Sequence, residues 1–473
     1  MINIMNTEKL TQGINKFWDE EISPTICEYI KIPNKSPAFD SDWKANGYMD
    51  KVVDLVKDWV ELYKPLHSSL HILKEGNRTP LLLLDIPGEC DGTILMYGHL
   101  DKQPEMEGWS DGLGPWEPVL KNDKLFGRGG ADDGYAVFAS ICSINALLEQ
   151  DIKLPRIVVL IECSEESGSP DLPFYMDHCA DIIGSPDLVI CLDSGAGNYE
   201  QFWTTTSLRG LIGCTLRVDI LTEGIHSGGG SGIASSSFRI MRQLLSRLED
   251  EKSGHIIVED LIVDIPDDRI NEVQAMVDVL GDEVFNTLPW IRNAGPITDD
   301  KVEMVLNNTW RSMLSVVGAD GLPAVKDGGN VLRPYTTVKL SLRIPPTLEA
   351  ISAQKIVHDI LTSDPPYGAK ISVDFEEPAT GWEAPPLSQW LDDAIQQASV
   401  AIFNKPALAM GEGGTIPFMS MLGEKFPDAQ FVITGVLGPQ SNAHGPNEFL
   451  HIPFAKKLTA CVAIIIENIV NNK

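Results

Sequence analysis

The sequence predicts an α/β protein in which a mostly parallel sheet forms one domain and a smaller α+β sheet domain is inserted into it. Short apolar segments at 93–97, 155–163 and 186–192 alternate with helical patterns, as parallel strands joined by crossover helices do. From about residue 208 the apolar pattern changes to longer alternating strands. After about residue 384 the first pattern, short apolar strands alternating with helices, returns. We therefore expect a first domain of residues 1–207 and 384–473, interrupted by a second domain of residues 208–383.

The elements of the first domain follow from the spacing of apolar residues. Helical spacing covers 9–31, with an interruption near Pro24, and again 43–63. Strand-like runs lie at 71–73 and 81–86, and the passage GWSDGLGPWEP predicts a loop. The glycine loop LFGRGGADDG then leads into a helix that begins near Asp132. Towards the C-terminus we expect helices over 389–403 and 454–470 and a buried strand over 431–436.

The inserted segment predicts a small ferredoxin-like sheet. LRGLIGCTLRVDIL and VLRPYTTVKLSLRIPP alternate as half-exposed strands do, and 370–375 predicts a further strand. Helical patterns at 237–248 and 351–361 separate them, and EGIHSGGGSGIASS predicts a flexible loop. The order is strand, helix, strand, helix, strand, which is typical of an α+β domain.

Composition and charge exclude several classes of protein. The chain has 37 Lys and Arg residues against 67 Asp and Glu, and this net charge of −30 would repel nucleic acid and anionic membranes. Its apolar runs are too short to span a bilayer, and the N-terminus lacks the pattern of a signal peptide. The eight cysteines are scattered without a CxxC pair, so we expect reduced thiols and a cytoplasmic protein.

Histidine and carboxylate side chains follow the predicted strands at the end where open α/β sheets bind ligands. The candidates are His99, Asp101, Asp132, Glu165, Glu166, Asp193 and His444. Two histidines with several carboxylates suit zinc or manganese. Seven groups are too many for one tetrahedral site. They would serve two metals that share a bridging carboxylate, with one outer carboxylate and one general base.

Other chemistries lack their motifs. The chain has no GxxxxGK[ST], GxSxG or HExxH, and no GxGxxG between a strand and a helix. The glycines 228–230 are not followed by the lysine that a phosphate-binding loop needs.

Eight short motifs resemble one family. MYGHLDKQP, LFGRGGADDG, ECSEESGS, LDSG, LRG…IHSG, KLSLRIPP, EGGTIP and NAHGPNE occur in that order from about residue 93 to 452. Together they resemble the M20 metallopeptidases and, within that family, the branch of carnosinase-like and cytosolic non-specific dipeptidases. The resemblance implies a di-metal catalytic domain, an inserted lid and dimerisation domain, a small peptide substrate and a homodimer.

The same resemblance implies a role for each candidate at the metal site. Asp132 would bridge two divalent ions, Zn²⁺ or alternatively Mn²⁺, and the peptide bond between it and Asp133 would be cis. The remaining ligands would be His99 and Asp193 for one ion, and Glu166 and His444 for the other.

Two carboxylates would act beside the metals. Asp101 would hydrogen-bond His99 and fix its tautomer, and Glu165 would be the general base for the attacking water. Neighbouring residues of an extended segment point to opposite sides. Such a segment would turn Glu166 to the metal and Glu165 to the water.

Four residues are implied in substrate binding. His226 would reach across a dimer to stabilise the oxyanion, and Arg343 would grip the C-terminal carboxylate of the substrate. Asn330 stands where carnosinase-like enzymes carry threonine, and Thr415 stands where they carry serine. Both can still hydrogen-bond, so these departures leave hydrolysis in place and the preferred dipeptide open.

Hydrolysis of dipeptides or short peptides is the first hypothesis. An N-acyl amino acid amidohydrolase could use the same di-metal site. A binding or scaffolding relative without catalysis is a third possibility, but such a protein would be expected to have lost Glu165 or a metal ligand.

Overall fold

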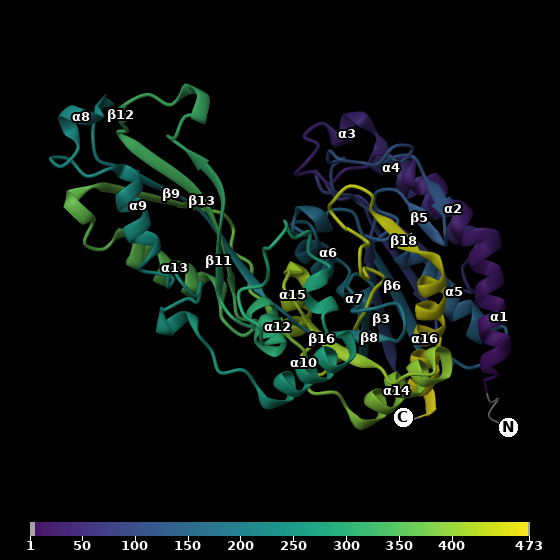
Figure 1. Cartoon of the computed structure of the whole chain (residues 1–473). Coiled ribbons are helices and arrows are strands. Elements are labelled where there is room, and N and C mark those ends of the chain that lie inside the picture. The colour runs from purple at the N-terminus through teal and green to yellow at the C-terminus, as the bar shows by residue number, and fades with distance from the viewer. Residues whose placement is uncertain (1–4, 472–473) are drawn as a thin grey trace. The chain divides into compact units, whose positions relative to one another are not determined.

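The computed structural model describes residues 5–471, which form two compact units (Figure 1). The first unit runs to Thr206 and also contains Ala384–Met410 and the residues from Met421 onward. The second unit contains Ser207–Glu383 and Gly411–Ser420. The segment Gly411–Ser420 therefore belongs to the second unit, whereas the sequence analysis placed it within 384–473 of the first domain.

A six-stranded sheet of order β1-β2-β6-β3-β7-β17 forms the centre of the first unit. Its strands are β1 (Ser69–Leu73), β2 (Leu81–Ile86), β3 (Thr93–His99), β6 (Arg156–Glu162), β7 (Leu188–Cys191) and β17 (Gln430–Ile433). The four strands β6, β3, β7 and β17 are parallel, and β2 pairs antiparallel with both β1 and β6. Because β3 lies between β6 and β7, the residues that leave these three strands meet at one edge.

The first unit also contains several helices. They are α1 (Thr7–Phe17), α2 (Ser23–Ile30), α3 (Trp43–Asn46), α4 (Tyr48–Tyr63), α5 (Ala136–Leu148), α6 (Leu172–His178), α7 (Ala180–Ile183), α14 (Gln389–Phe403) and α16 (Ile452–Asn471). A further helix, α15 (Pro417–Lys425), begins in the second unit and ends in the first. The helix α5 is buried almost all round, since it packs on β3 and β6 and contacts α1 and α16 (Figure 1). It begins at Ala136, so Asp132 lies in the turn before it.

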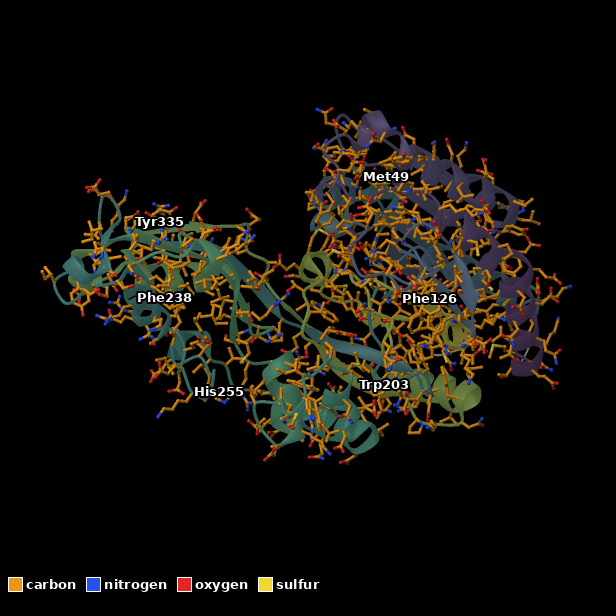
Figure 2. The ribbon with its side chains drawn as sticks, turned by 45° about the horizontal axis from the view of Figure 1, so that its top comes forward. Met49, Phe126, Trp203, Phe238, His255 and Tyr335 are labelled. Atoms are coloured by element: carbon orange, nitrogen blue, oxygen red, sulfur yellow. The ribbon has the colours of Figure 1, made fainter. Side chains whose placement is uncertain are left out.

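Two of the predicted helices are interrupted. The π-helical segment Trp18–Ile22 separates α1 from α2, and the second of these helices has Pro24 in its first turn. Gly47, in the left-handed conformation, separates α3 from α4. Side chains fill the first unit densely around these helices, as Figure 2 shows near Met49.

Two three-stranded sheets contain further strands, and one of these strands, Trp382–Glu383, belongs to the second unit. One has the order β18-β5-β4 and is made of Phe449–His451, Lys124–Phe126 and Val119–Lys121. The other has the order β15-β8-β16 and is made of Trp382–Glu383, Trp203–Leu208 and Leu408–Glu412. The pairing of β18 with β5 joins the segment after His444 to the segment before Asp132.

The second unit contains the predicted ferredoxin-like sheet. Its strands are β9 (Gly210–Asp219), β11 (Met313–Asp320), β13 (Tyr335–Ile344) and β14 (Lys370–Phe375), in the order β11-β13-β9-β14. The helices α9 (Ser237–Leu245) and α13 (Ala350–Thr362) cover it around a core that includes Leu216, Ile240 and Leu340. Figure 2 shows Phe238 and Tyr335 in this unit. Strand and helix follow the βαββαβ order of that fold.

Several elements of the second unit extend the prediction. The helices α10 (Asp267–Leu280), α11 (Glu283–Asn286) and α12 (Lys301–Thr309) pack around a small core with Val273 and Trp310. The expected flexible loop instead holds the strand β10 (Ile225–His226), paired with β12 (Val331–Leu332), and the short helix α8 (Ser227–Gly230). Among residues 5–471, no helix combines the length and the apolar character needed to cross a membrane.

Candidate metal centre

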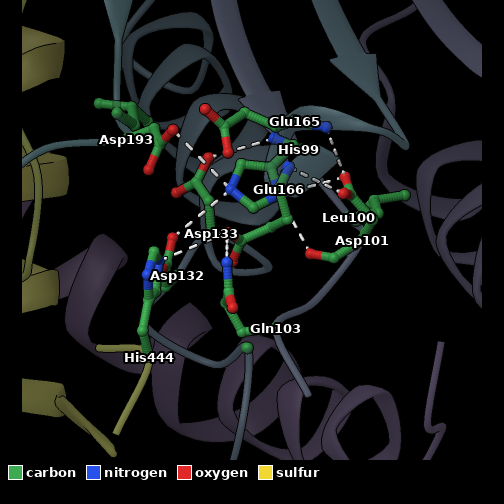
Figure 3. Close-up of polar contacts among 12 residues, drawn as sticks. His99, Leu100, Asp101, Gln103, Asp132, Asp133, Glu165, Glu166, Asp193 and His444 are labelled. Atoms are coloured by element: carbon green, nitrogen blue, oxygen red, sulfur yellow. Dashed lines mark hydrogen bonds and ion pairs between the residues drawn. The ribbon is translucent and has the colours of Figure 1, made fainter. Parts of the chain in front are cut away.

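Six predicted metal-site residues come together in the first unit, together with Asp101 (Figure 3). His99 is the last residue of β3, the turn Glu165–Ser167 follows β6, and Asp193 follows β7. Asp132 comes from the turn before α5, and His444 comes from the loop between β17 and β18. The parallel strands therefore deliver their ligands to one edge, as the sequence pattern predicts.

Two groups of possible ligands share Asp132. The first contains His99, Asp132 and Asp193, and the second contains Asp132, Glu166 and His444. Within each group the ligand atoms lie within 4.8 Å of one another. His99 Nε2 is 3.5 Å from Asp132 Oδ1 and 3.8 Å from Asp193 Oδ2. His444 Nε2 is 2.9 Å from Asp132 Oδ2 and 3.4 Å from Glu166 Oε2. The grouping is the one implied by the motifs.

The ring of His99 is oriented through its Nδ1 atom. This nitrogen lies 3.1 Å from the main-chain oxygen of Asp101 and 3.5 Å from the Asp101 carboxylate. A proton on Nδ1 leaves Nε2 as the free lone pair, and this buried atom has no hydrogen-bond partner among the described residues. Asp101 thus holds the ring chiefly with its main-chain oxygen, whereas the sequence analysis assigned this contact to its side chain.

The Asp101 carboxylate instead holds the turn that carries the two glutamates. It accepts hydrogen bonds from the main-chain N–H groups of Glu165, at 3.1 Å, and Glu166, at 3.0 Å. Glu165–Ser167 is a 3₁₀ turn. The expectation of an extended segment at this point is therefore wrong, and the side chains diverge from a tight turn. Two acceptor oxygens facing adjacent N–H groups stabilise such a turn.

A second buried carboxylate, Glu162, supports the same turn. Its Oε1 accepts from the hydroxyls of Tyr97, at 2.7 Å, and Ser169, at 2.8 Å, and its Oε2 accepts from Ser164, at 3.1 Å. These two serines lie on either side of the 3₁₀ turn. The sequence analysis missed Glu162, although a carboxylate that ends the apolar run RIVVLIE was a visible signal.

Gln103 is another contact that the sequence analysis missed. Its Nε2 donates to Glu166 Oε2 at 2.6 Å, and the residue lies in the HLDKQP motif (Figure 3). Asp133 also contributes, since its Oδ2 accepts from the main-chain N–H of His99 at 3.2 Å. The peptide bond between Asp132 and Asp133 is cis, as the resemblance implies.

The electrostatics of the cluster suit divalent cations. Burial raises the pKa of Glu165 well above its usual range, and repulsion from Asp193 raises it further. Burial also raises the pKa of Asp193, to about 6, although His99 acts in the opposite direction. Burial opposes ionisation of Asp132, but its interactions with the neighbouring imidazoles of His444 and His99 outweigh this effect and lower the pKa. Bound cations would stabilise the ionised form of buried carboxylates this close together.

The donor atoms also fit such ions. Glu166 Oε1 and His99 Nε2 are both buried and have no hydrogen-bond partner within residues 5–471. Carboxylate oxygens and imidazole nitrogens without thiolate are ligands that zinc and manganese accept. The described residues therefore form a candidate dinuclear metal site around Asp132.

The four predicted substrate-binding residues lie in the second unit, in two separate places. His226 is exposed and pairs with Val331, and Asn330 accepts a hydrogen bond from Ser227 through its main-chain oxygen. Arg343 donates to the Thr415 hydroxyl at 2.9 Å, near the other end of β13. His226 and Asn330 form one pair of neighbours, and Arg343 and Thr415 form another.

Known proteins resemble the chain over most of its length. It is 28% identical over 382 residues to cysteinylglycine-S-conjugate dipeptidase from Corynebacterium striatum, with 77% of this chain and 79% of that protein covered. It is 27% identical over 372 residues to human Beta-Ala-His dipeptidase, with 74% and 70% covered.

Solved structures share the fold. The di-peptidase Dug1p from Saccharomyces cerevisiae aligns with a TM-score of 0.76 and 17% identity, over 100% of both chains. Human carnosine dipeptidase 1 aligns with a TM-score of 0.75 and 21% identity, over 99% of this chain and 100% of that one. Residues 95–468 match Peptidase family M20/M25/M40, which is most of the chain. With the fold and the paired ligand groups, this match shows that the chain belongs to Peptidase family M20/M25/M40.

Proposed function

We propose that this protein hydrolyses the peptide bond of dipeptides or short peptides at a dinuclear metal centre. The observation that carries the proposal is the sharing of Asp132 by two ligand groups, with the Glu165 carboxylate beside them. Family membership supports peptide hydrolysis, and two relatives of similar length are dipeptidases by name.

The ligands would hold two divalent ions, with Zn²⁺ first and Mn²⁺ as the alternative. His99 and Asp193 would complete one site and Glu166 and His444 the other, with Asp132 between them. Bound ions would lower the pKa of an attacking water and polarise the substrate carbonyl. All five side chains come from segments fixed by the sheet edge or by buried hydrogen bonds.

Glu165 is the proposed general base. It would take the proton of the attacking water and return it to the leaving amine. Burial is the largest cause of its raised pKa, which favours a carboxylate that holds the proton between these two steps. Asp101 and Glu162 would keep the base in place by fixing both the N–H groups and the flanking serines of its turn.

Arg343 is the proposed anchor for the C-terminal carboxylate of the substrate, and the Thr415 hydroxyl lies beside it. Burial lowers the pKa of Arg343, but a guanidinium stays charged at neutral pH. The first unit would then be the catalytic domain, and the second would be a lid and dimerisation domain.

The spacing within the second unit supports a homodimer. Tyr335 and Arg343 lie eight positions apart on β13, which corresponds to roughly 27 Å at about 3.4 Å per residue. His226 and Asn330 lie beyond the Tyr335 end of that strand. One dipeptide is too short to reach both pairs of one chain. If all four residues act on one substrate, His226 and Asn330 must come from a second copy.

A reducing compartment, the cytoplasm, is the proposed location. The eight cysteines are all free thiols, and six of them are buried in the core. Such cysteines pack as small apolar residues, and free thiols of this kind are typical of proteins in reducing compartments.

The test is hydrolysis of a dipeptide library by metal-free protein reconstituted separately with Zn²⁺ and Mn²⁺, beside a panel of N-acetyl amino acids. We expect turnover of dipeptides that depends on added metal. A strong preference for the acetylated panel would favour the amidohydrolase alternative, and no hydrolysis of either panel would contradict the proposal.

The variant His99→Ala gives the matching test of the site. We expect it to abolish hydrolysis and to reduce the bound metal measured by atomic emission, because it removes one ligand of the first group. His178→Ala is the control, since His178 is exposed on α6. An active, fully metallated His99→Ala protein would overturn the assignment.

A further inference from the structure

His444 reaches the metal centre on a loop in which several residues other than glycine have a left-handed backbone conformation. Gln440, Asn442, His444 and Asn447 all have positive φ, between 54° and 64°. Residues with a side chain adopt this conformation at a cost, so a loop that contains four of them needs support from outside. Inside the loop, a turn from Gly445 N–H to Asn442 O is present, and Phe449 N–H donates to Ser441 O.

One support from outside is Arg128, which forms a buried ion pair with Glu448, and the Ser110 N–H donates to Asn447 Oδ1 at 2.8 Å. The side chain of Arg128 is 1% exposed and that of Glu448 is 0% exposed, and the Arg128 Nη1 donates to Glu448 Oε2. Arg128 Nη2 also donates to the main-chain oxygen of Gly445, the residue after His444, at 2.8 Å. Arg128 therefore holds the His444 loop at two points, Gly445 and Glu448.

The contacts run in the other direction as well. Glu448 Oε1 accepts from the Gly129 N–H at 2.8 Å, and its main-chain oxygen accepts from the Gly127 N–H at 3.0 Å. Arg128 comes four residues before Asp132, and Glu448 comes four residues after His444. The pair thus ties the segment that delivers the shared ligand to the segment that delivers His444.

Only the second ligand group takes a residue from the tied loop, whereas both groups share Asp132. The group of His99, Asp132 and Asp193 contains no residue of the 439–448 loop, and the His99 side chain is fully buried at the end of β3. The His444 side chain is 54% exposed, so little packing around its ring holds it. Its position against Asp132 rests on the loop beneath it.

We propose that Arg128 and Glu448 are a positioning pair for the second metal site, made of Asp132, Glu166 and His444, and that they set the affinity of this site without affecting the first. The inference rests on the proposed dinuclear centre. Residues behind metal ligands typically change metal affinity by about 10–100-fold when they are replaced.

The experiment titrates metal-free protein with Mn²⁺ by calorimetry and follows the loaded forms by electron paramagnetic resonance. Wild-type protein should bind two equivalents and show the signal of two coupled ions. The Glu448→Gln variant keeps the shape of the side chain and removes the charge opposite Arg128. We expect it to bind the first ion as wild type does, to bind the second about 10–100-fold more weakly, and to lose the coupled signal.

A second variant and a double-mutant cycle complete the design. Arg128→Lys keeps a positive charge but cannot contact Glu448 and Gly445 at the same time, as the guanidinium does. If Glu448→Gln does not fold, Arg128→Lys is used in its place. In a His444→Ala background, Glu448→Gln should change Mn²⁺ binding no further, because both act on one site. Asp85→Asn is the control, since it breaks the Asp85–Arg156 ion pair on β2 and should leave both affinities unchanged.

The outcomes separate this inference from the proposed function. Wild-type affinity at both sites in both variants, or equal weakening of both sites, would overturn the positioning role while leaving the dinuclear centre intact. Wild-type protein that bound no Mn²⁺ and no Zn²⁺ would overturn the dinuclear centre, and this inference with it.

Discussion

At the scale of the residue, the role of a polar side chain depends on which of its hydrogen-bonding atoms are already used within the protein. The Thr415 hydroxyl donates to the main-chain oxygen of Arg209 at 2.6 Å and accepts from Arg343 at 2.9 Å. Arg209 is buried, and its side chain donates to main-chain oxygens that include Gly413, at 3.2 Å. Thr415 is thus committed to holding Arg343, and its hydroxyl hydrogen is already used within the protein.

Replacing Thr415 tests that arrangement. Thr415→Val keeps the shape and removes the acceptor for Arg343, and a hydrogen bond to a charged group is worth about 1.5–3 kcal/mol. We expect the KM for dipeptides with a free C-terminus to rise at least about tenfold, with a smaller change in kcat. Steady-state kinetics with a free and a C-terminally amidated dipeptide are the measurement, because only the former should respond.

Thr415→Ser is the control for this prediction. It restores the hydroxyl and should return the KM close to that of the parent protein. Equal KM values for the valine and parent proteins would show that the hydroxyl does not position Arg343.

Glu162 gives a prediction about pH. Burial is the main cause that raises its pKa to about 7, and repulsion from Asp101 adds to the effect. The folded protein therefore binds more protons at Glu162 than the unfolded chain between pH 4.5 and pH 7, and its stability falls as the pH rises through that window. Glu162→Gln removes the titration and keeps an acceptor oxygen.

The measurement is the free energy of unfolding by urea, in chelator, at about pH 5 and about pH 8. The difference between Glu162→Gln and parent protein should shift in favour of the variant by up to about 3 kcal/mol between these values. A difference that does not change with pH would mean that Glu162 does not titrate in this range.

At the scale of the element, the ligands are placed by a close approach between β3 and α5. A Cβ atom on Gly98 would lie 2.6 Å from the Ala136 Cβ and 2.7 Å from Asp133 Oδ2. Gly98 precedes His99 on the strand, and Ala136 is the first residue of the helix that follows Asp132. The glycine therefore lets two ligand-bearing elements touch.

Gly98→Ala should push these elements apart. Overpacking of a dense core costs about 1–3 kcal/mol, and here it would also displace Asp133 from the main chain of His99. We expect a lower free energy of unfolding and weaker metal binding in the same protein, measured by urea unfolding and by metal titration. Gly229→Ala is the matched control, since a Cβ there meets nothing within 4 Å. Unchanged metal binding in Gly98→Ala would contradict this account.

The sequence predicted the elements in which apolar residues recur with a clear period or form a continuous run. β3 and β6 are buried along almost their whole length, and α14 matches its predicted bounds. The helix α10 was missed because it buries only Arg269 and Val273, so its apolar face is weak. β11 was missed because most of it is exposed at the sheet edge.

The same limit applies within the site. His99, Asp132 and His444 were predicted because they stand in motifs, and their residue types bind metals. Glu448 and Arg128 come from segments 320 residues apart, and nothing local signals that they meet. Glu162, likewise, gains its role only when Ser164 and Ser169 fold back onto it. Such roles depend on contacts between segments that are distant in the sequence. The periodicity of apolar residues carries no information about those contacts.

At the scale of the whole molecule, the proposed homodimer makes each active site a product of two chains. The metal ligands lie in one unit, and His226 lies at the end of β13 away from Arg343 in the other. A His99→Ala subunit would have a damaged metal site and an intact His226. A His226→Ala subunit would have the reverse.

Mixing these two inactive variants should therefore restore activity. Random reassortment of subunits makes half of the dimers mixed, and each mixed dimer has one complete site, so we expect about a quarter of parent activity. The measurement is dipeptide hydrolysis after mild dissociation and reassociation, with light scattering to confirm dimers. His99→Ala mixed with Glu165→Gln is the control, because both changes lie in the first unit and no mixed dimer gains a complete site. Recovery equal to that control, or a protein that is monomeric throughout, would show that His226 does not act on a second copy.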